Sequence, residues 1–297
     1  MKADTYLITG AGSGLGKGVA LGLAKRGEQV IAAVETKEQV AELTQEAEVG
    51  QISLQVEKLD ITEAADRERA FGWPVDVLVN NAGVGLGGAV VDIPESFLRR
   101  QFEVNVFGTI LLTQGYAKQM ARRRRGRILI VSSIHGIAAD PLVGPYCASK
   151  HALEAFGEAL AKEMQEFAVQ VQMINPGPYL TGFNELEFES WKDWQDDPEG
   201  RIFDYSKFAF PYPQFAPEGA IKEMLVIISG KRDKFRNIVP RSMSVVAKKM
   251  QKGPWKRSAD KDLFIIDSTI MRSKEMEPAT KPGEAVIDKL KDIFSKR

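Results

Sequence analysis

Short apolar runs alternate with longer helical segments along most of this chain, and no other feature constrains its fold as strongly. Six of the runs are rich in β-branched residues: TYLITG, QVIAAV, ISLQV, DVLVNN, RILIVSS and VQVQMINPG. Strands with so few polar positions must be covered on both faces, and the helices between them imply right-handed crossovers and parallel pairing. The sequence therefore predicts an α/β fold with a doubly wound parallel sheet of about seven strands, with FRNIV as the candidate last strand.

The C-terminal part of the chain departs from this alternation. Ten aromatic side chains gather between residues 183 and 215, a density that favours a wall or lid over even filling of the core. Beyond Pro240 the chain becomes polar and rich in lysine. We predict one domain over residues 1–240, which includes a lid at 182–216, and a C-terminal extension of the same domain at 241–297.

Charge and cysteine content narrow the class of protein. Forty basic side chains balance forty acidic ones among 297 residues, so no overall field draws the chain to nucleic acid or to an anionic membrane. No apolar run approaches the ~20 residues that span a bilayer. The single cysteine, Cys147, allows no internal disulfide. We therefore expect a cytoplasmic protein without a nucleic-acid or membrane partner. The basic cluster Arg122–Arg127 is interpreted as the solvated end of a helix, where cations complement the helix dipole.

A glycine-rich turn, TGAGSGLG, lies between the first strand and the first helix. Its glycines at positions 10, 14 and 16 set the spacing, and position 12 is a further glycine. Glycines let the backbone turn tightly and approach a pyrophosphate, whose charge then lies at the N-terminus of the helix. The alternative is a plain tight turn. In the first strand–helix unit of a parallel sheet, the pattern favours a dinucleotide-binding site of the Rossmann type.

The glycine spacing resembles the short-chain dehydrogenase/reductase family, whose pattern is T-G-x-x-x-G-x-G. Further segments agree with it in order and spacing: NNAG from Asn80, the serine pair at 132–133, YCASK from Tyr146, and NPGPYLT from Asn175. The resemblance covers about residues 5–240 and implies an NAD(P)-binding domain in a homo-oligomer, a dimer or tetramer. It assigns these cofactor contacts: Gly10, Ser13, Gly14, Leu15, Gly16, Glu35, Asp60, Ile61, Asn81, Ala82, Gly83, Tyr146, Lys150, Pro176, Gly177 and Thr181.

The choice between NAD and NADP depends on charge near the adenosine ribose. Glu35 ends the second strand, where its carboxylate would accept bonds from a ribose diol and repel a 2′-phosphate. Ser13 precedes the second glycine, a position where phosphate-selecting relatives often carry a basic residue. Lys17 and Lys37 lie nearby and qualify this reasoning, and a solvated strand-end carboxylate is the alternative for Glu35. The prediction is NAD.

Tyr146 and Lys150 are four residues apart, which puts both side chains on one face of a helix. A phenol with its ordinary pKa of about 10 is too weak a base at neutral pH, and a neighbouring ammonium favours the phenolate. By resemblance, Tyr146 is the general acid/base, Lys150 orients the nicotinamide ribose and Ser133 holds the substrate oxygen. Ser132 is the alternative serine, and the spacing of thirteen residues to Tyr146 favours Ser133. Asn105 matches the family's fourth catalytic residue, which positions a water that relays protons.

The predicted reaction is hydride transfer between NAD and a secondary alcohol or ketone. The aromatic lid suggests an apolar or aromatic substrate, with these contacts: His135, Tyr179, Phe183, Trp191 and Trp194. The alternative for the aromatic rings is to hold an irregular segment on the body. His151 and Cys147 are interpreted as packing residues, and two histidines with one cysteine suggest no metal site. Three alternatives remain open: a lapsed enzyme that senses dinucleotides, an NADP-preferring carbonyl reductase, and an epimerase or dehydratase.

Overall fold

The central sheet of this protein has seven parallel strands, about the number that the sequence predicted, and their order is β3-β2-β1-β4-β5-β6-β7. A computed structural model describes residues 4–260 and 265–274. The strands are β1 (Thr5–Thr9), β2 (Gln29–Val34), β3 (Gln55–Lys58), β4 (Val77–Asn80), β5 (Gly126–Val131), β6 (Val169–Pro176) and β7 (Arg236–Val239).

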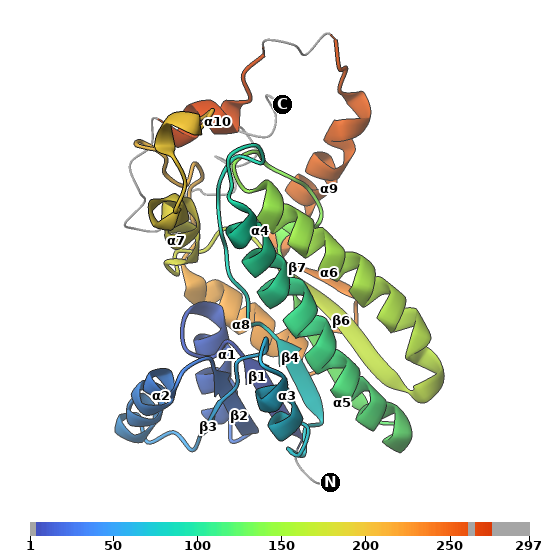
Figure 1. Ribbon diagram of the computed structural model, residues 1–297. Helices are drawn as coiled ribbons and strands as arrows, with labels where there is room; N and C mark the ends of the chain where they lie inside the picture. The colour runs from blue at the N-terminus through green and yellow to red at the C-terminus, as the bar shows by residue number, and fades with distance from the viewer. Residues whose placement is uncertain (1–3, 261–264, 275–297) are drawn as a thin grey trace.

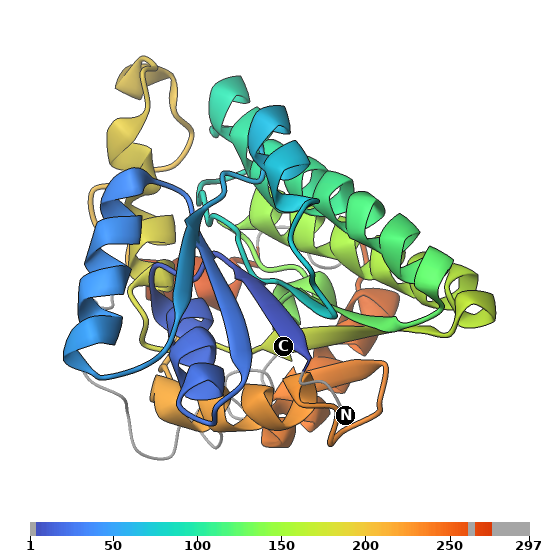
Figure 2. The same ribbon diagram turned by 90° about the horizontal axis from the view of Figure 1, so that it is seen from below.

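Helices cover both faces of the sheet, as Figures 1 and 2 show. One apolar cluster joins the sheet to α1, α2 and α8, and a second joins the opposite face to α3, α5 and α6. The helices described are α1 (Gly14–Ala24), α2 (Lys37–Val49), α3 (Ala64–Ala70), α4 (Glu95–Phe102), α5 (Thr109–Arg123), α6 (Gly144–Glu163), α7 (Phe183–Glu189), α8 (Pro217–Ile228), α9 (Ser244–Lys252) and α10 (Ser268–Ser273).

The strand residues alternate between the two clusters because successive side chains of a strand point to opposite faces. Leu7 packs in the α5–α6 cluster and its neighbour Ile8 in the α1–α8 cluster, and both side chains are fully buried. This double burial explains why the central residues of β1, Tyr6 to Ile8, are apolar in succession rather than at every second position.

Two predicted elements differ in detail from those observed. The third strand begins at Gln55 rather than at Ile52, because its register with β2 starts at the pair Ile31–Gln55, and Ile52 instead packs beside the α1–α8 cluster. The long helical pattern after β4 is interrupted by a π-helical turn, Glu103–Gly108, between α4 and α5. A Cβ at Gly108 would lie only 2.9 Å from Cγ1 of Ile61, so a glycine permits this close approach.

The order of the strands reverses between β1 and β4, since β2 and β3 lie on one side of this pair and β5 to β7 on the other. In open parallel sheets the carboxyl ends of the strands at such a switch point border a crevice in which ligands bind. The lid follows β6 as α7 and short 3-10 turns, and returns to the body where Phe215 pairs with Tyr179.

The first part of the C-terminal extension packs on the body. Met243, Val246 and Ala247 are buried in a third apolar cluster that also contains Tyr146 and the lid aromatics. Figure 1 shows α9 at the same end of the molecule as α7 and α10. The remainder of the predicted extension, residues 261–264 and 275–297, lies outside the described residues.

Candidate active site

A cavity of about 770 Å³ opens at the carboxyl ends of the strands, a size suited to a cofactor together with a small molecule. Its wall combines the turn between β1 and α1, the ends of β3 to β6, the start of α6 and the lid. Every cofactor and catalytic residue predicted from the sequence lines it except Asn105.

The glycine-rich turn forms one end of the cavity and needs its glycines for steric reasons. Gly10 and Gly14 have φ angles of 63° and 54°, in the left-handed region that glycine adopts without strain. A Cβ at Gly16 would lie 2.3 Å from Nδ2 of Asn81 and 2.4 Å from the carbonyl oxygen of Gly10. The chain can therefore approach itself, and a ligand, only because these side chains are missing.

Asn81, which was predicted as a cofactor contact, also holds this turn in place. Its Nδ2 donates to the carbonyl oxygens of Thr9, at 3.0 Å, and Gly10, at 3.1 Å. The Thr9 hydroxyl in turn accepts bonds from the backbone N–H groups of Asn81 and Ala82. The NNAG segment thus fixes the turn between β1 and α1 through side-chain bonds.

The N-terminus of α1 suits a phosphate group. Ser13 occupies the position before the helix and its side chain makes no capping bond, whereas Thr36 and Gln39 form a reciprocal capping box at the start of α2. The first N–H groups of α1 therefore remain available beside the glycine turn, where the helix dipole favours an anion. The residues of this turn fit the pyrophosphate of a dinucleotide.

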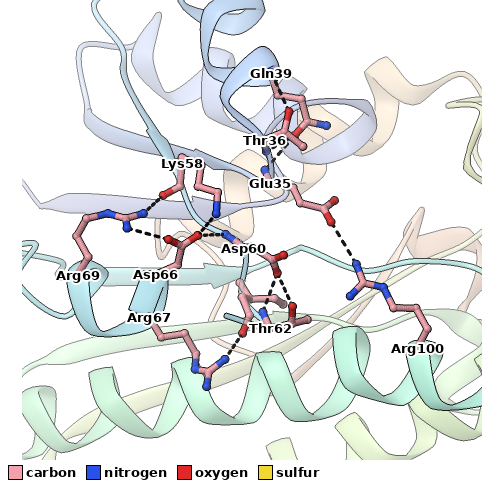
Figure 3. A network of polar contacts seen from close by, with 11 residues as sticks. Glu35, Thr36, Gln39, Lys58, Asp60, Thr62, Asp66, Arg67, Arg69 and Arg100 are labelled. Carbon is pink, nitrogen blue, oxygen red and sulfur yellow. Dashed lines mark hydrogen bonds and ion pairs between the residues drawn. The ribbon is translucent and has the colours of Figure 1, made fainter. Parts of the chain in front are cut away.

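The opposite, adenosine end contains a charged pair that sequence reasoning did not anticipate (Figure 3). The half-exposed Glu35 carboxylate lies 3.2 Å from the Arg100 guanidinium of α4, and both residues line the cavity. Gln39 also lines it and accepts the backbone N–H of Glu35 through Oε1 at 2.9 Å. The Asp60 carboxylate accepts two bonds from Thr62, at 2.7 and 2.9 Å, which fixes its position at the end of β3.

Ser133, Tyr146 and Lys150 come together in the middle of the cavity. All three are buried and line it, and the Ser133 hydroxyl is within hydrogen-bonding reach of the Tyr146 phenol. The Lys150 ammonium lies 5.6 Å from the centre of the Tyr146 ring and donates to the carbonyl oxygen of Val131 at 3.1 Å. The hydroxyl of the alternative serine, Ser132, is buried without a hydrogen-bond partner.

The pKa of Tyr146 differs from the value expected for a phenol beside an ammonium group. Burial raises the pKa of Tyr146, and the carboxylate of Glu187 raises it further, while the bond from Ser133 lowers it. Burial also lowers the pKa of Lys150 to about 8. The protein alone therefore holds Tyr146 as the neutral phenol, the form that can donate a proton, and the expected depression of its pKa by Lys150 is not seen. The charge of an oxidised nicotinamide would favour the phenolate.

Asn105 is fully buried in the π-helical turn and does not face solvent. Its Oδ1 accepts the N–H of Val84 at 2.8 Å, and its Nδ2 donates to the carbonyl of Val84 and to the Ser149 hydroxyl. Ser149 donates to the carbonyl oxygen of Tyr146 at 2.7 Å. The structure thus connects Asn105 to the start of α6, and the water relay stays a prediction.

Three of the five predicted substrate contacts line the cavity: His135, Tyr179 and Phe183. The Phe183 ring lies 5.7 Å from that of Tyr146, and the His135 ring 6.0 Å from it on another side. His135 also approaches the buried Asp140, with 3.3 Å between Nε2 and Oδ2. The cavity therefore has an aromatic wall around the Tyr146 phenol.

Trp191 and Trp194 are not brought into this cavity, contrary to the prediction that they contact the substrate. Trp194 packs edge-on against Phe97 and Tyr205, and the Arg201 guanidinium lies within 6 Å of both indole rings. These rings hold the lid on the body, which was the alternative reading. The density of aromatic residues in the sequence does not tell which of the rings lie outside the cavity.

Several residues in or beside the cavity were missed by the sequence reasoning. Glu187, on the lid helix, is 1% exposed, and its Oε1 has no hydrogen-bond partner. Burial raises its pKa from 4.5 to about 7, partly offset by the charges of His135 and Lys150. Helical spacing puts Glu187 on the same face as the predicted Phe183, the one local signal that could have found it. Residues that line the cavity itself and were missed include Gln39, Arg100, Asp140, Ser190, Phe210, Tyr212, Met243 and Met250.

The remaining candidate groups make no second site. Cys147 is buried, and burial raises the pKa of its thiol, so it is a packing residue rather than a nucleophile. Nδ1 of His151 lies 2.8 Å from the carbonyl oxygen of Cys147. Within residues 4–260 and 265–274, no group of three metal-ligating side chains is found. No helix in these ranges is long and apolar enough to cross a bilayer.

The dinucleotide turn, the buried Ser/Tyr/Lys trio and the seven-stranded sheet together define an NAD(P)-binding oxidoreductase fold. Residues 4–191 match the family model of the short-chain dehydrogenases, and the chain belongs to this family. It is similar to the uncharacterized oxidoreductase YusZ of Bacillus subtilis, 38% identical over 61% of this chain and 67% of that protein. It is also similar to a 3-ketodihydrosphingosine reductase of Bacteroides thetaiotaomicron, 34% identical over 62% of this chain and 67% of the relative.

Human 17-beta-hydroxysteroid dehydrogenase type 1 is 35% identical over 62% of this chain and 60% of its own length. The chain thus matches about 60 to 67% of the length of these relatives. Among solved structures, a short-chain dehydrogenase/reductase from Mycobacterium ulcerans aligns with a TM-score of 0.66 and 26% identity, over 80% of this chain and 88% of the other.

Proposed function

We propose that this protein is an NAD-dependent oxidoreductase that transfers a hydride between the nicotinamide and a secondary alcohol or ketone. The observation that carries the proposal is the meeting of Ser133, Tyr146 and Lys150 in one cavity with the glycine turn. The glycine turn and Lys150 would hold a nicotinamide cofactor, which would supply the acceptor or donor of the hydride. Tyr146 takes up the hydroxyl proton in oxidation and donates it in reduction, and Ser133 holds the substrate oxygen.

An apolar substrate of considerable size suits the wall around Tyr146. Phe183, Phe210 and Tyr212 line this part of the cavity, together with Met243 and Met250. Support also comes from the names of similar proteins, a retinol dehydrogenase, a hydroxysteroid dehydrogenase and a reductase of a ketosphingoid. The proposed substrate class is tested by measuring NADH formation at 340 nm with a panel of apolar and aromatic secondary alcohols.

The carboxylate of Glu35 supports NAD, because it would repel a 2′-phosphate. One observation favours NADP as the second candidate: Arg100 lies beside Glu35 and lines the cavity, where its guanidinium could bind that phosphate. A similar protein is an NADPH-dependent reductase. Comparison of kcat/KM with NAD and with NADP, in the wild type and in Arg100→Ala, distinguishes the two candidates. An NADP preference that Arg100→Ala abolishes would overturn the proposed choice of NAD.

The catalytic role is tested with Tyr146→Phe, which keeps the ring and removes the proton. We expect a loss of at least about a hundredfold in kcat, because the group that takes up and donates the proton is gone. Wild-type turnover in this variant would contradict the role of Tyr146. Cofactor binding without any turnover over a broad panel would instead favour the dinucleotide sensor. A homo-oligomer is also proposed, by family resemblance, and light scattering after size exclusion would measure it.

A further inference from the structure

The segment that follows the last strand has an uneven charge that the balanced composition of the whole chain conceals. Between residues 241 and 258 there is no acidic residue and there are six basic ones: Arg241, Lys248, Lys249, Lys252, Lys256 and Arg257. This segment forms α9 and the 3-10 turn after it. The expectation of no membrane partner rested on the charge of the whole chain. A chain with no net charge can still have a basic surface that binds an anionic membrane.

The described residues include two basic clusters, which differ in whether their side chains have hydrogen bonds and ion pairs within the protein. In the arginine cluster, Arg124 donates to the carbonyl oxygen of Glu166 at 2.7 Å and Arg125 pairs with Asp4 at 2.6 Å. Arg123 donates to the carbonyl of Val75 and lies 3.8 Å from Asp76. That cluster is largely satisfied within the fold.

The lysines of the C-terminal segment are not satisfied in this way. Lys248, Lys249, Lys252 and Lys256 are all exposed, and within the part of the chain that the structure describes none has an ion pair or a side-chain hydrogen bond. Only Arg257 has an acidic partner there, Asp267 at 3.7 Å. Four positive charges therefore face solvent together.

Apolar side chains accompany these lysines. Trp255 is 90% exposed on the turn after α9, and Val245 is 66% exposed on the helix. Val246 and Ala247 point inward and are buried, which fixes α9 on the body. We call the outward side chains Lys248, Lys249, Lys252, Trp255 and Lys256 the basic face. A combination of lysine and tryptophan is typical of surfaces that enter the headgroup region of a bilayer.

The basic face belongs to a segment that also borders the cavity. Met250 on α9 and Met243 just before it both line the cavity, near Phe210 and Tyr212. Figure 1 shows that α9 projects at the end of the molecule where the lid lies. A surface bound here would therefore adjoin the apolar part of the cavity.

We propose that the basic face docks on an anionic lipid bilayer, so that an apolar alcohol or ketone can pass from the acyl region into the cavity. The bilayer is favoured over nucleic acid because an exposed tryptophan contributes burial among lipid headgroups, and because the cavity beside it is lined by apolar side chains. The docking itself is independent of the proposed function, whereas the delivery of substrate rests on it.

Cosedimentation with vesicles tests the docking without substrate or cofactor. We expect binding to vesicles that contain phosphatidylglycerol, little binding to pure phosphatidylcholine, and release at high salt. The triple variant Lys248→Glu, Lys249→Glu and Lys252→Glu should weaken binding by about a hundredfold, at roughly fivefold per lost lysine. Trp255→Ala should weaken it further and remove the blue shift of tryptophan emission on binding.

The matched control makes the same change of net charge elsewhere, with Lys118→Glu, Lys222→Glu and Lys231→Glu, three exposed lysines on other surfaces. It should bind vesicles nearly as well as the wild type. If the control lost vesicle binding to the same extent, overall charge would explain the effect and the assignment of binding to the basic face would be overturned. Absence of vesicle binding by the wild type would also overturn it, and so would retention on a polyanion in place of vesicles.

Activity separates this inference from the function on which its second part rests. The basic-face variant should oxidise a water-soluble secondary alcohol as fast as the wild type, and a lipid-dissolved alcohol presented in phosphatidylglycerol vesicles more slowly. Turnover without vesicle binding would refute the docking and leave the function intact. Vesicle binding without turnover of any alcohol would support the docking and count against the function.

Discussion

Replacement of Glu187 by glutamine should stabilise the protein at alkaline pH and leave it nearly unchanged in acid. The carboxyl group is 1% exposed, its Oε1 lacks a hydrogen-bond partner, and burial raises its pKa from 4.5 to about 7. Such a rise corresponds to roughly 3 kcal/mol of unfavourable free energy for the ionised form in the folded state.

The direction of the pH dependence follows from proton binding. Between pH 4.5 and about 7 the folded protein keeps the proton of Glu187 while the unfolded chain loses it. The free energy of unfolding therefore falls as the pH rises through this range, and the full penalty applies above it. The amide of Glu187→Gln cannot ionise, so the variant should be more stable than the wild type by up to roughly 3 kcal/mol near pH 8.

Urea unfolding at about pH 5 and about pH 8 would measure the difference. Glu189→Gln, which removes an exposed carboxylate from the end of the same lid helix, is the control and should show no such pH dependence. If the gain of Glu187→Gln were the same at both pH values, it would come from packing, and the reasoning from a buried charge would be refuted.

Three further changes test the packing and charge of the fold by urea unfolding. Gly16→Ala should destabilise the protein by about 1–3 kcal/mol, because the new Cβ would lie 2.3 Å from Nδ2 of Asn81, and no loss would contradict the packing of the turn. Gly219→Ala in α8 meets no atom within 4 Å and should instead gain about 0.5–1 kcal/mol. Burial raises the pKa of Asp66, but bonds from Lys58, the Asp60 N–H and Arg69 outweigh this effect and lower the pKa to about 2. Asp66→Asn should therefore destabilise the protein by about 2 kcal/mol at neutral pH. This difference should disappear as the pH falls through about 2. An equal cost at all pH values would exclude the ionised carboxylate as its source.

Elements that depend on local pattern were predictable from the amino-acid sequence. The middle of β1 is continuously apolar because the strand is buried on both faces, and the glycines at 10 and 14 mark the positive φ angles of one turn. Tyr146 and Lys150 share a helix face because their spacing is one helical turn. The fold class and the shared helix face of this pair were therefore predictable from neighbouring residues.

Features that join distant segments depend on the tertiary fold. Arg100 and Glu35 are 65 residues apart in the sequence and meet only in the folded chain. Aromatic density could not tell Phe183, which faces Tyr146, from Trp194, which packs on Tyr205. The charge environment of Tyr146 also depends on burial and on Glu187 of the lid, terms that arise only when the chain is folded, because they are set by solvent exclusion and by distances through space.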